Sequence, residues 1–360
     1  MNKIPTLALI ALCAIAFHSV TAKAGDVDGA GSSFVAPIMA KWADDYAKTS
    51  GVNVSYEPIG SGAGIEKIKA GTVDFGATDK PLTPEELQTA GLCQFPVVIG
   101  GVVPVVNIPG VPPGEMKLSG KVLALIFMGK VTNWNASEIA RDNGGLSLPD
   151  LAITVVHRSD GSGTTFNWAS YLASSSIAWS TEVGTGLSVP WPVGVGSEGN
   201  GGVSASVLQT PGAIGYVEYT YALENNLTYT QVQNHQGLFV APSADTFQAS
   251  ASTINWNNYK DFSVSIGSAA GGPTAYPIAA TTFVLMYKRP KEAARTAAVL
   301  AFFKWALEEG GEQASALHYV ALPPGLVKRV QIYWETQIQG ESSSEAGHVQ
   351  SGSDTERRAD

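Results

Sequence analysis

Three short turns rich in glycine and serine constrain the fold of this chain more than any other feature. They cover residues 29–34, 59–64 and 160–164, and each comes just before a segment with helical periodicity. The second and third turns follow the β-branched segments 52–56 and 153–156, which we expect to be strands. Alternation of strands and helices predicts an α/β fold, in which strand-to-helix turns of a parallel sheet meet at one edge.

Each of these turns carries the chemical groups that hold an anion. A helix start offers backbone N–H groups without partners and the positive end of the helix dipole. Glycine lets a ligand approach the backbone closely, and Ser33, Ser61 and Ser162 add hydroxyl groups. One such turn alone is better interpreted as an ordinary helix N-cap. Three turns in one α/β chain favour a shared anion-binding site.

Three charged residues extend this hypothesis. Arg158 lies just before the third turn, where its guanidinium can bind two oxygens of a tetrahedral anion and Asp160 can orient it. Asp79 ends the segment 73–79, which we expect to be a strand. An aspartate there can accept the proton that phosphate keeps at neutral pH, whereas sulfate has no such proton. The alternative role for Asp79 is to cap a helix near Pro81.

The N-terminus has the pattern of a secretory signal peptide over residues 1–24. Lys3 precedes the apolar run 6–17, and Ala22-Lys23-Ala24 gives the small-x-small pattern of a cleavage site. The apolar run is too short for a membrane anchor. The formal net charge of −9 becomes more negative when the two signal lysines are removed, which argues against a nucleic-acid partner.

Cysteine and histidine give little support for other chemistry. After signal removal Cys93 is the single cysteine, so no disulfide can form within the chain, and we expect it to be a small buried residue. The five histidines have no metal-binding spacing, and we expect neither a metal nor a cofactor. Residues 341–360 are rich in serine, glycine and charge and are expected to form a disordered tail.

Enzyme motifs are incomplete. The serines near glycine each miss one glycine of the Gly-x-Ser-x-Gly elbow of serine hydrolases. Residues 194–199 do match the Gly-x-Gly-x-x-Gly pattern of dinucleotide-binding sites. Pro190 and Pro192 precede this segment and Gly201-Gly202 follows it, so we predict a loop there rather than a strand, a turn and a helix.

Several long motifs resemble one known family over residues 29–339. They are GAGSSFVAPIMAKWADDY at 29–46, IGSGAG at 59–64, TVDFGATDKPL at 72–82 and HRSDGSGTTF at 157–166. The chain is similar in these motifs to the periplasmic phosphate-binding protein of the bacterial phosphate-specific ABC transporter.

The resemblance implies a two-lobed α/β binding protein of the type II, or Venus-flytrap, class. Each lobe would contain a central mixed sheet, and a hinge would join the lobes. Lobe 1 would comprise residues 25–99 and 275–340, and lobe 2 would comprise residues 100–274. We place the first crossing between the lobes near residue 100 and the return near residue 275.

The resemblance also implies a phosphate site in the cleft between the lobes. The residues that match the family's motif are Ser33, Ser61, Ser162 and Thr164 for hydroxyl groups, Phe34 and Gly163 for backbone N–H groups, Asp79 as proton acceptor, and Arg158 as charged contact oriented by Asp160. The family often has threonine at the first of these positions, and Ser33 keeps the hydroxyl.

The implied function is high-affinity binding of phosphate in the periplasm and its delivery to the permease subunits of an inner-membrane ABC transporter. The protein would be a monomer and not an enzyme. The alternatives are a secreted phosphatase built on the same scaffold, and a secreted surface protein whose cleft has lost its ligand. A phosphatase would need an activated nucleophile or a metal-bound water, which the predicted site does not supply.

Overall fold

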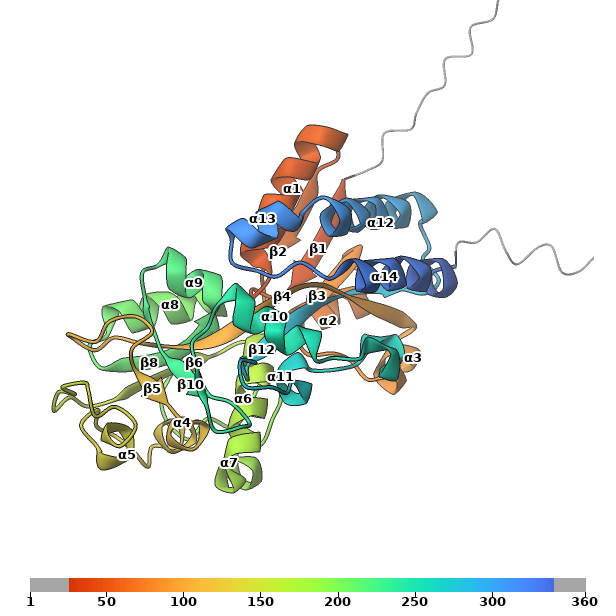
Figure 1. Ribbon diagram of the computed structural model, residues 1–360. Coiled ribbons are helices and arrows are strands. Elements are labelled where there is room, and N and C mark those ends of the chain that lie inside the picture. The colour runs from red at the N-terminus through yellow and green to blue at the C-terminus, as the bar shows by residue number, and fades with distance from the viewer. Residues whose placement is uncertain (1–25, 340–360) are drawn as a thin grey trace, which may run out of the picture.

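The computed structural model describes residues 26–339 (Figure 1). The expected signal peptide of residues 1–24 and the expected tail of residues 341–360 lie outside the described residues. Within residues 26–339, no helix combines the length and apolar character needed to cross a membrane.

Nine strands form a sheet that runs through the described part of the chain. The order is β2-β1-β3-β12-β4-β8-β6-β7, and β9 also pairs with β4. The strands are β1 (Val27–Gly31), β2 (Val54–Glu57), β3 (Phe75–Thr78), β4 (Leu92–Val106), β6 (Thr154–Arg158), β7 (Val195–Ser197), β8 (Ala213–Glu218), β9 (Thr228–Tyr229) and β12 (Ala279–Tyr287). A smaller sheet has the order β11-β10-β5 and consists of β5 (Lys117–Leu118), β10 (Gln231–Gln233) and β11 (Phe239–Val240).

Helices pack around the nine-stranded sheet. Figure 1 shows α1, α12 and α13 grouped near β1 and β2, α14 beside α12 and packed on β4, and α8 and α9 grouped near β8. The helices are α1 (Ala36–Ser50), α2 (Ser61–Lys69), α3 (Pro84–Ala90), α4 (Gly120–Phe127), α5 (Ser137–Ala140), α6 (Gly163–Ser175), α7 (Ile177–Glu182), α8 (Gly199–Gln209), α9 (Tyr219–Glu224), α10 (Ala244–Ser252), α11 (Ile266–Ala269), α12 (Ala293–Glu308), α13 (Gly311–Ala316) and α14 (Pro324–Gln337). Two 3₁₀ turns, η1 (Trp256–Asn258) and η2 (Lys260–Phe262), lie between α10 and α11.

Strand β4 joins the two halves of the sheet. Residues 92–101 pair antiparallel with β12, and residues 102–106 pair antiparallel with β8. All its residues are buried. Gly100 and Gly101 lie where the pairing changes, and a Cβ atom on either would clash with a phenylalanine ring, so this part of the strand depends on glycine.

Both halves of the sheet contain parallel and antiparallel pairs. In the first half β1 pairs parallel with β2 and β3, and β12 runs antiparallel to β3. In the second half β6 pairs parallel with β7 and β8. The α/β prediction is confirmed, and the segments predicted as strands at 52–56 and 153–156 correspond to β2 and β6 within two residues at either end. Strands β1, β2 and β6 each lead into one of the three glycine-serine turns.

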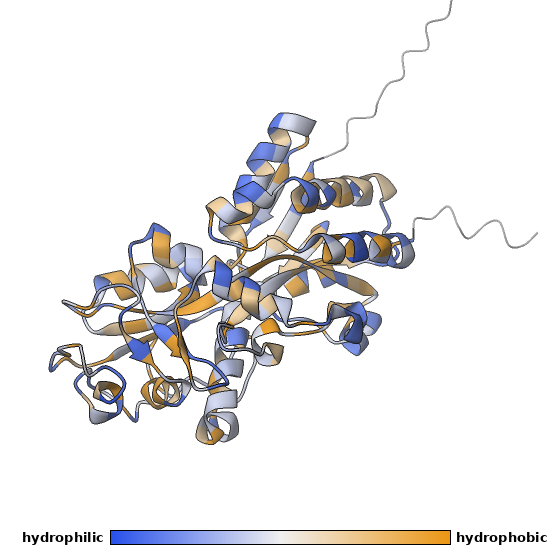
Figure 2. Cartoon of the chain, in the orientation of Figure 1, coloured by the Kyte–Doolittle hydropathy of each residue, from blue (hydrophilic) through white to orange (hydrophobic). Residues whose placement is uncertain are grey.

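The core is rich in aromatic rings. Phe95 and Phe303 meet edge to face with ring centroids 5.7 Å apart, and Trp168 stacks on Tyr216 at 5.1 Å. Figure 2 shows hydrophobic residues concentrated along the central strands, with hydrophilic residues on the outward sides of the surrounding helices. Cys93 is buried, as predicted, and burial raises the pKa of its thiol to about 12. It is therefore a packing residue at neutral pH.

Candidate anion-binding site

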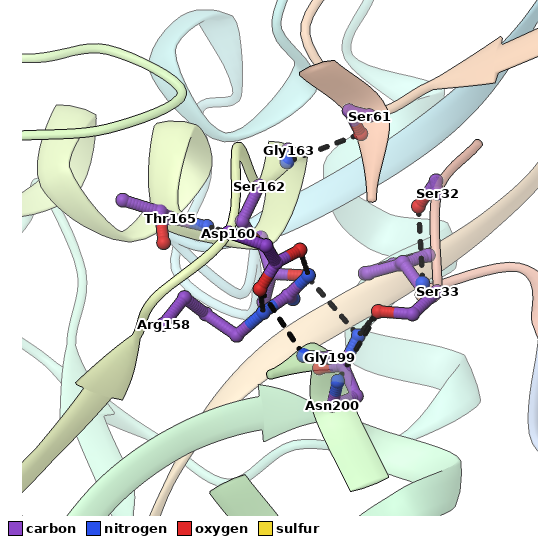
Figure 3. A network of polar contacts seen from close by, with 12 residues as sticks. Ser32, Ser33, Ser61, Arg158, Asp160, Ser162, Gly163, Thr165, Gly199 and Asn200 are labelled. Carbon is purple, nitrogen blue, oxygen red and sulfur yellow. Dashed lines mark hydrogen bonds and ion pairs between the residues drawn. The ribbon is translucent and has the colours of Figure 1, made fainter. Parts of the chain in front are cut away.

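The second and third turns lie in direct contact, as the sequence predicted (Figure 3). The backbone N–H of Gly62 donates to the carbonyl of Gly161 at 2.8 Å, and that of Gly163 donates to Ser61 Oγ at 3.1 Å. A Cβ atom on Gly62 would lie 3.2 Å from the Cα of Gly161. The absence of side chains at both positions therefore allows the two helix starts to approach this closely.

Two of the three turns coincide with a helix start. Helix α2 begins at Ser61 and α6 begins at Gly163. Ser162 is the N-cap of α6, and its Oγ accepts the backbone N–H of Thr165 at 3.0 Å, which leaves its own hydroxyl hydrogen free to donate elsewhere. Helix α1 begins only at Ala36, so the first turn precedes its helix by more than the other two do.

Asp79 lies at the centre of a group of hydroxyls. It is buried, its Oδ1 accepts from Thr282 Oγ1 at 2.7 Å, and its Oδ2 accepts from Ser32 Oγ at 2.5 Å and from Ser61 Oγ at 3.4 Å. Burial raises the pKa of this carboxyl to about 6, against the lowering effect of the hydroxyls and of Arg158. At neutral pH Asp79 is therefore mostly ionised and is able to accept a proton or a hydrogen bond.

The alternative role of Asp79 as a helix cap is wrong. The helix that follows, α3, has Thr83 as its N-cap, with the Thr83 side chain accepting the backbone N–H of Glu86 at 3.2 Å. Glu86 completes a capping box by accepting the Thr83 N–H. Asp79 therefore does not cap this helix. Its carboxylate instead contacts Ser61 in the second turn and Thr282.

Arg158 and Asp160 form the charged part of the site. Arg158 is buried at the end of β6, and both its Nε and its Nη2 bond to the two carboxylate oxygens of Asp160, with Nε at 2.6 Å from Oδ1. Its Nη1 donates to Thr164 Oγ1 at 3.3 Å. Burial favours the neutral form of Asp160, but the hydrogen bond and charge of Arg158 outweigh it and lower the pKa of this carboxyl. The bidentate geometry fixes the plane of the guanidinium.

The backbone carbonyl oxygens of the first turn accept hydrogen bonds from side chains of other elements. Three tyrosine hydroxyls donate to three successive carbonyls: Tyr56 to Ser32 at 2.8 Å, Tyr221 to Ser33 at 2.8 Å and Tyr319 to Phe34 at 2.6 Å. The backbone N–H of Phe34, predicted as an anion donor, donates here to Ser32 Oγ at 3.0 Å. The hydroxyl of Ser33 accepts from Asn200, in α8, at 2.9 Å.

The predicted loop at residues 194–199 is wrong. Residues 195–197 form β7, which pairs parallel with β6, and α8 begins at Gly199 and continues through Gly201-Gly202. The helix forms despite its glycines because Val203 and Val207 are fully buried and α8 packs on β8. The start of α8 reaches the site, since the Gly199 N–H donates to Asp160 Oδ1 at 3.1 Å.

Several residues of this site were missed from the sequence. They are Ser32, Thr282, Asn200 and the three tyrosines. Ser32 adjoins Ser33 within the first turn, so its hydroxyl could have been named as a candidate together with that of Ser33. Asn200 was missed because residues 194–199 were predicted to form a loop, whereas α8 begins at Gly199. Thr282 reaches Asp79 from a strand more than two hundred residues later, and no local pattern indicates such a contact.

The arrangement brings together hydroxyls, backbone N–H groups, one guanidinium and one carboxylate. Hydroxyls and a guanidinium suit an oxyanion, and the ionised carboxylate suits an anion that still carries a proton. Within residues 26–339 there is no group of three or more His, Cys, Asp or Glu side chains placed to hold a metal ion. The site thus has the chemistry to bind a protonated oxyanion.

Comparisons with known proteins agree with this chemistry. Residues 18–309 match the family model described as a PBP superfamily domain. The chain is 51% identical over 317 residues to the phosphate-binding protein PstS of Xylella fastidiosa (strain 9a5c), covering 88% of this chain and 87% of that protein. It is 46% identical over 330 residues to PstS of Pasteurella multocida (strain Pm70), covering 91% and 96%.

A solved structure shares the fold. The phosphate binding protein from Stenotrophomonas maltophilia aligns over 86% of this chain and 94% of its own, with a TM-score of 0.61 and 20% sequence identity. The family inferred from the sequence motifs is confirmed by the two relatives, both named as binding proteins. The chain belongs to the PBP superfamily and, within it, to the family of the phosphate-binding protein PstS.

Proposed function

We propose that this protein binds inorganic phosphate with high affinity and delivers it to the permease subunits of an ABC phosphate transporter. The observation that carries the proposal is the buried Asp79 carboxylate, which lies among the hydroxyls of Ser32, Ser61 and Thr282 near the Arg158–Asp160 pair. A dissociation constant on the order of 1 µM requires about 8 kcal/mol of binding free energy. Several charge-assisted hydrogen bonds in a buried site can supply it.

The proposed ligand contacts are those inferred from the sequence. Arg158, oriented by Asp160, makes the charged contact, and Asp79 accepts the phosphate proton. The remaining contacts are the hydroxyls of Ser33, Ser61, Ser162 and Thr164 and the backbone N–H groups of Phe34 and Gly163. All of these residues except Asp160 are buried, and they come from elements that the fold brings together.

The two-lobed, hinge-closing organisation is part of the proposal. Lobe 1 comprises residues 25–99 and 275–340, and lobe 2 comprises residues 100–274. The change of pairing partner in β4 at Gly101–Val102 supports a crossing near residue 100. Residues of the two proposed lobes meet across the site, for example where Tyr221 donates to the Ser33 carbonyl. Phosphate bound between them would stabilise the closed form.

The proposed location is the periplasm. It rests on the signal-peptide pattern of residues 1–24 and on membership of the PstS family. A binding protein released there would capture phosphate and dock on an inner-membrane permease as a monomer. The phosphatase alternative has less support, because Ser162 caps α6 through Thr165 and both relatives are named as binding proteins.

Thermal unfolding tests this proposal on the chain without residues 1–24 and freed of bound phosphate. With a dissociation constant near 1 µM, 1 mM phosphate is expected to stabilise the protein by about 4 kcal/mol. For a protein of this size the unfolding midpoint should rise by several degrees. Sulfate at the same concentration is expected to leave it unchanged. No rise with phosphate would contradict the proposed function and favour a protein whose cleft has lost its ligand.

A further inference from the structure

Asn200 contacts two of the proposed phosphate-binding hydroxyls at once (Figure 3). It is the second residue of α8 and is fully buried. Its side-chain Nδ2 donates to Ser33 Oγ at 2.9 Å and to Thr164 Oγ1 at 3.3 Å. Its backbone N–H also donates to Ser33 Oγ, at 3.1 Å. The two hydrogens of one amide group are thus shared between two hydroxyls.

The orientation of this amide is determined by a backbone group. The N–H of Glu218 donates to Asn200 Oδ1 at 2.9 Å. A backbone N–H can only donate, so the oxygen of the amide must face Glu218 and the NH₂ group must face the hydroxyls. Asn200 therefore reaches Ser33 and Thr164 as a donor.

Both hydroxyls then have their acceptor capacity filled. A hydroxyl has one hydrogen and two lone pairs. Ser33 Oγ accepts from the backbone and the side chain of Asn200, and Thr164 Oγ1 accepts from Asn200 and from Arg158. With both lone pairs used, each hydroxyl can only donate its hydrogen, and this is the role needed to bind the oxygens of an oxyanion.

We propose that Asn200 is a positioning residue that makes the hydroxyls of Ser33 and Thr164 donors to the bound anion. The inference rests on the proposed function and extends its site. Ser33 precedes α1 and Thr164 belongs to α6, so the amide also joins the two proposed lobes at the site. It does so without contacting the anion itself.

A double-mutant cycle tests this role by isothermal titration with phosphate. Asn200→Ala is expected to weaken binding about 30-fold in the otherwise unchanged protein, since both hydroxyls lose a donor. In the Ser33→Ala Thr164→Val background there is no hydroxyl left to orient, and the same substitution should weaken binding only about threefold. Equal losses in the two backgrounds would overturn the assignment, because a purely structural role does not depend on the hydroxyls.

Two further variants separate this role from general effects on the fold. Asn143 is also a buried asparagine, and its amide bonds to the backbone of Lys117 and Ile139. Asn143→Ala should lower the unfolding midpoint and leave phosphate affinity unchanged. Asn200→Asp keeps the side-chain size but accepts from both hydroxyls, and should bind more weakly than Asn200→Ala.

Each result bears on a defined part of the inference. An Asn200→Asp variant that binds like the wild-type protein would overturn the assignment of Asn200. If Asn143→Ala weakened phosphate binding as much as Asn200→Ala, the effect at Asn200 would reflect the fold, and the assignment would also be wrong. Failure of the wild-type protein itself to bind phosphate would instead remove the proposed function on which the inference rests.

Discussion

Replacing Arg158 by alanine is expected to weaken phosphate binding by at least about 100-fold, because removing one partner of a buried, hydrogen-bonded charge pair between a protein and its ligand costs roughly 2–5 kcal/mol of binding free energy. The substitution removes the charged contact of the proposed site and leaves the Asp160 carboxylate without its two guanidinium bonds. It also removes one of the two donors to Thr164 Oγ1. Isothermal titration with phosphate measures the loss, at a temperature where the variant is shown to be folded.

Ser33→Ala provides the comparison for this prediction. It removes one neutral hydroxyl, and we expect a loss of about tenfold, in line with a single hydrogen bond. Asp160→Asn keeps the shape of the orienting residue while removing its charge, and should give an intermediate loss. Equal effects of Arg158→Ala and Ser33→Ala would contradict the assignment of the main charged contact to Arg158.

Asp79→Asn is expected to change which anion binds. In the wild-type protein a sulfate ion would face an ionised carboxylate with no proton between them, and such like-charge contacts cost several kcal/mol. The asparagine amide can instead donate a hydrogen bond to sulfate. We expect sulfate affinity to rise by at least about tenfold and phosphate affinity to fall, so that the preference for phosphate becomes small.

Competition between the two anions measures this change directly. The measurement is best made near pH 8, above the value of about 6 to which burial raises the Asp79 pKa. There the wild-type carboxylate is ionised and its exclusion of sulfate should be strongest. Thr282→Val is a useful control, since it removes one hydroxyl from Asp79 and keeps the carboxylate. If the Asp79→Asn variant kept the wild-type preference for phosphate over sulfate, Asp79 would not be the acceptor of the phosphate proton.

Much of the site could be predicted because its main residues are adjacent in sequence to recognisable turns. Strands β1, β2, β3 and β6 end at a residue of the site or within four residues of one, and short motifs at strand ends can be identified without a structure. The pairing of Arg158 with Asp160 is local as well. The contacts of Ser61 with Gly163 and of Gly62 with Gly161 followed from the expectation that such turns meet at one edge.

The remainder depends on contacts between distant segments. Thr282, Tyr221 and Tyr319 reach the site from strands, helices and loops far along the chain, and nothing in their own neighbourhood indicates it. The start of α8 was missed for a different reason. Glycines favour a loop by local propensity, but burial of Val203 and Val207 against the sheet outweighs that preference.

The contact of Glu218 with Tyr319 is another feature that the local sequence does not predict. Glu218 ends β8 and is fully buried, and burial raises the pKa of its carboxyl to about 8. The hydroxyl of Tyr319 lies 2.6 Å from the Phe34 carbonyl and 3.0 Å from Glu218 Oε2, and it has one hydrogen to share. Glu218 Oε2 also accepts the backbone N–H of Thr220 at 2.8 Å, which fixes the carboxyl group beside Tyr319. This carboxyl therefore supports the first turn through Tyr319.

Isothermal titration of the phosphate-free chain lacking residues 1–24, first with phosphate and then with sulfate, tests the central claim most directly. We expect one phosphate per chain with a dissociation constant on the order of 1 µM or below, and no heat of binding with sulfate. Tight binding of both anions would keep the oxyanion site but contradict the role of Asp79. Binding of neither would contradict the proposed function.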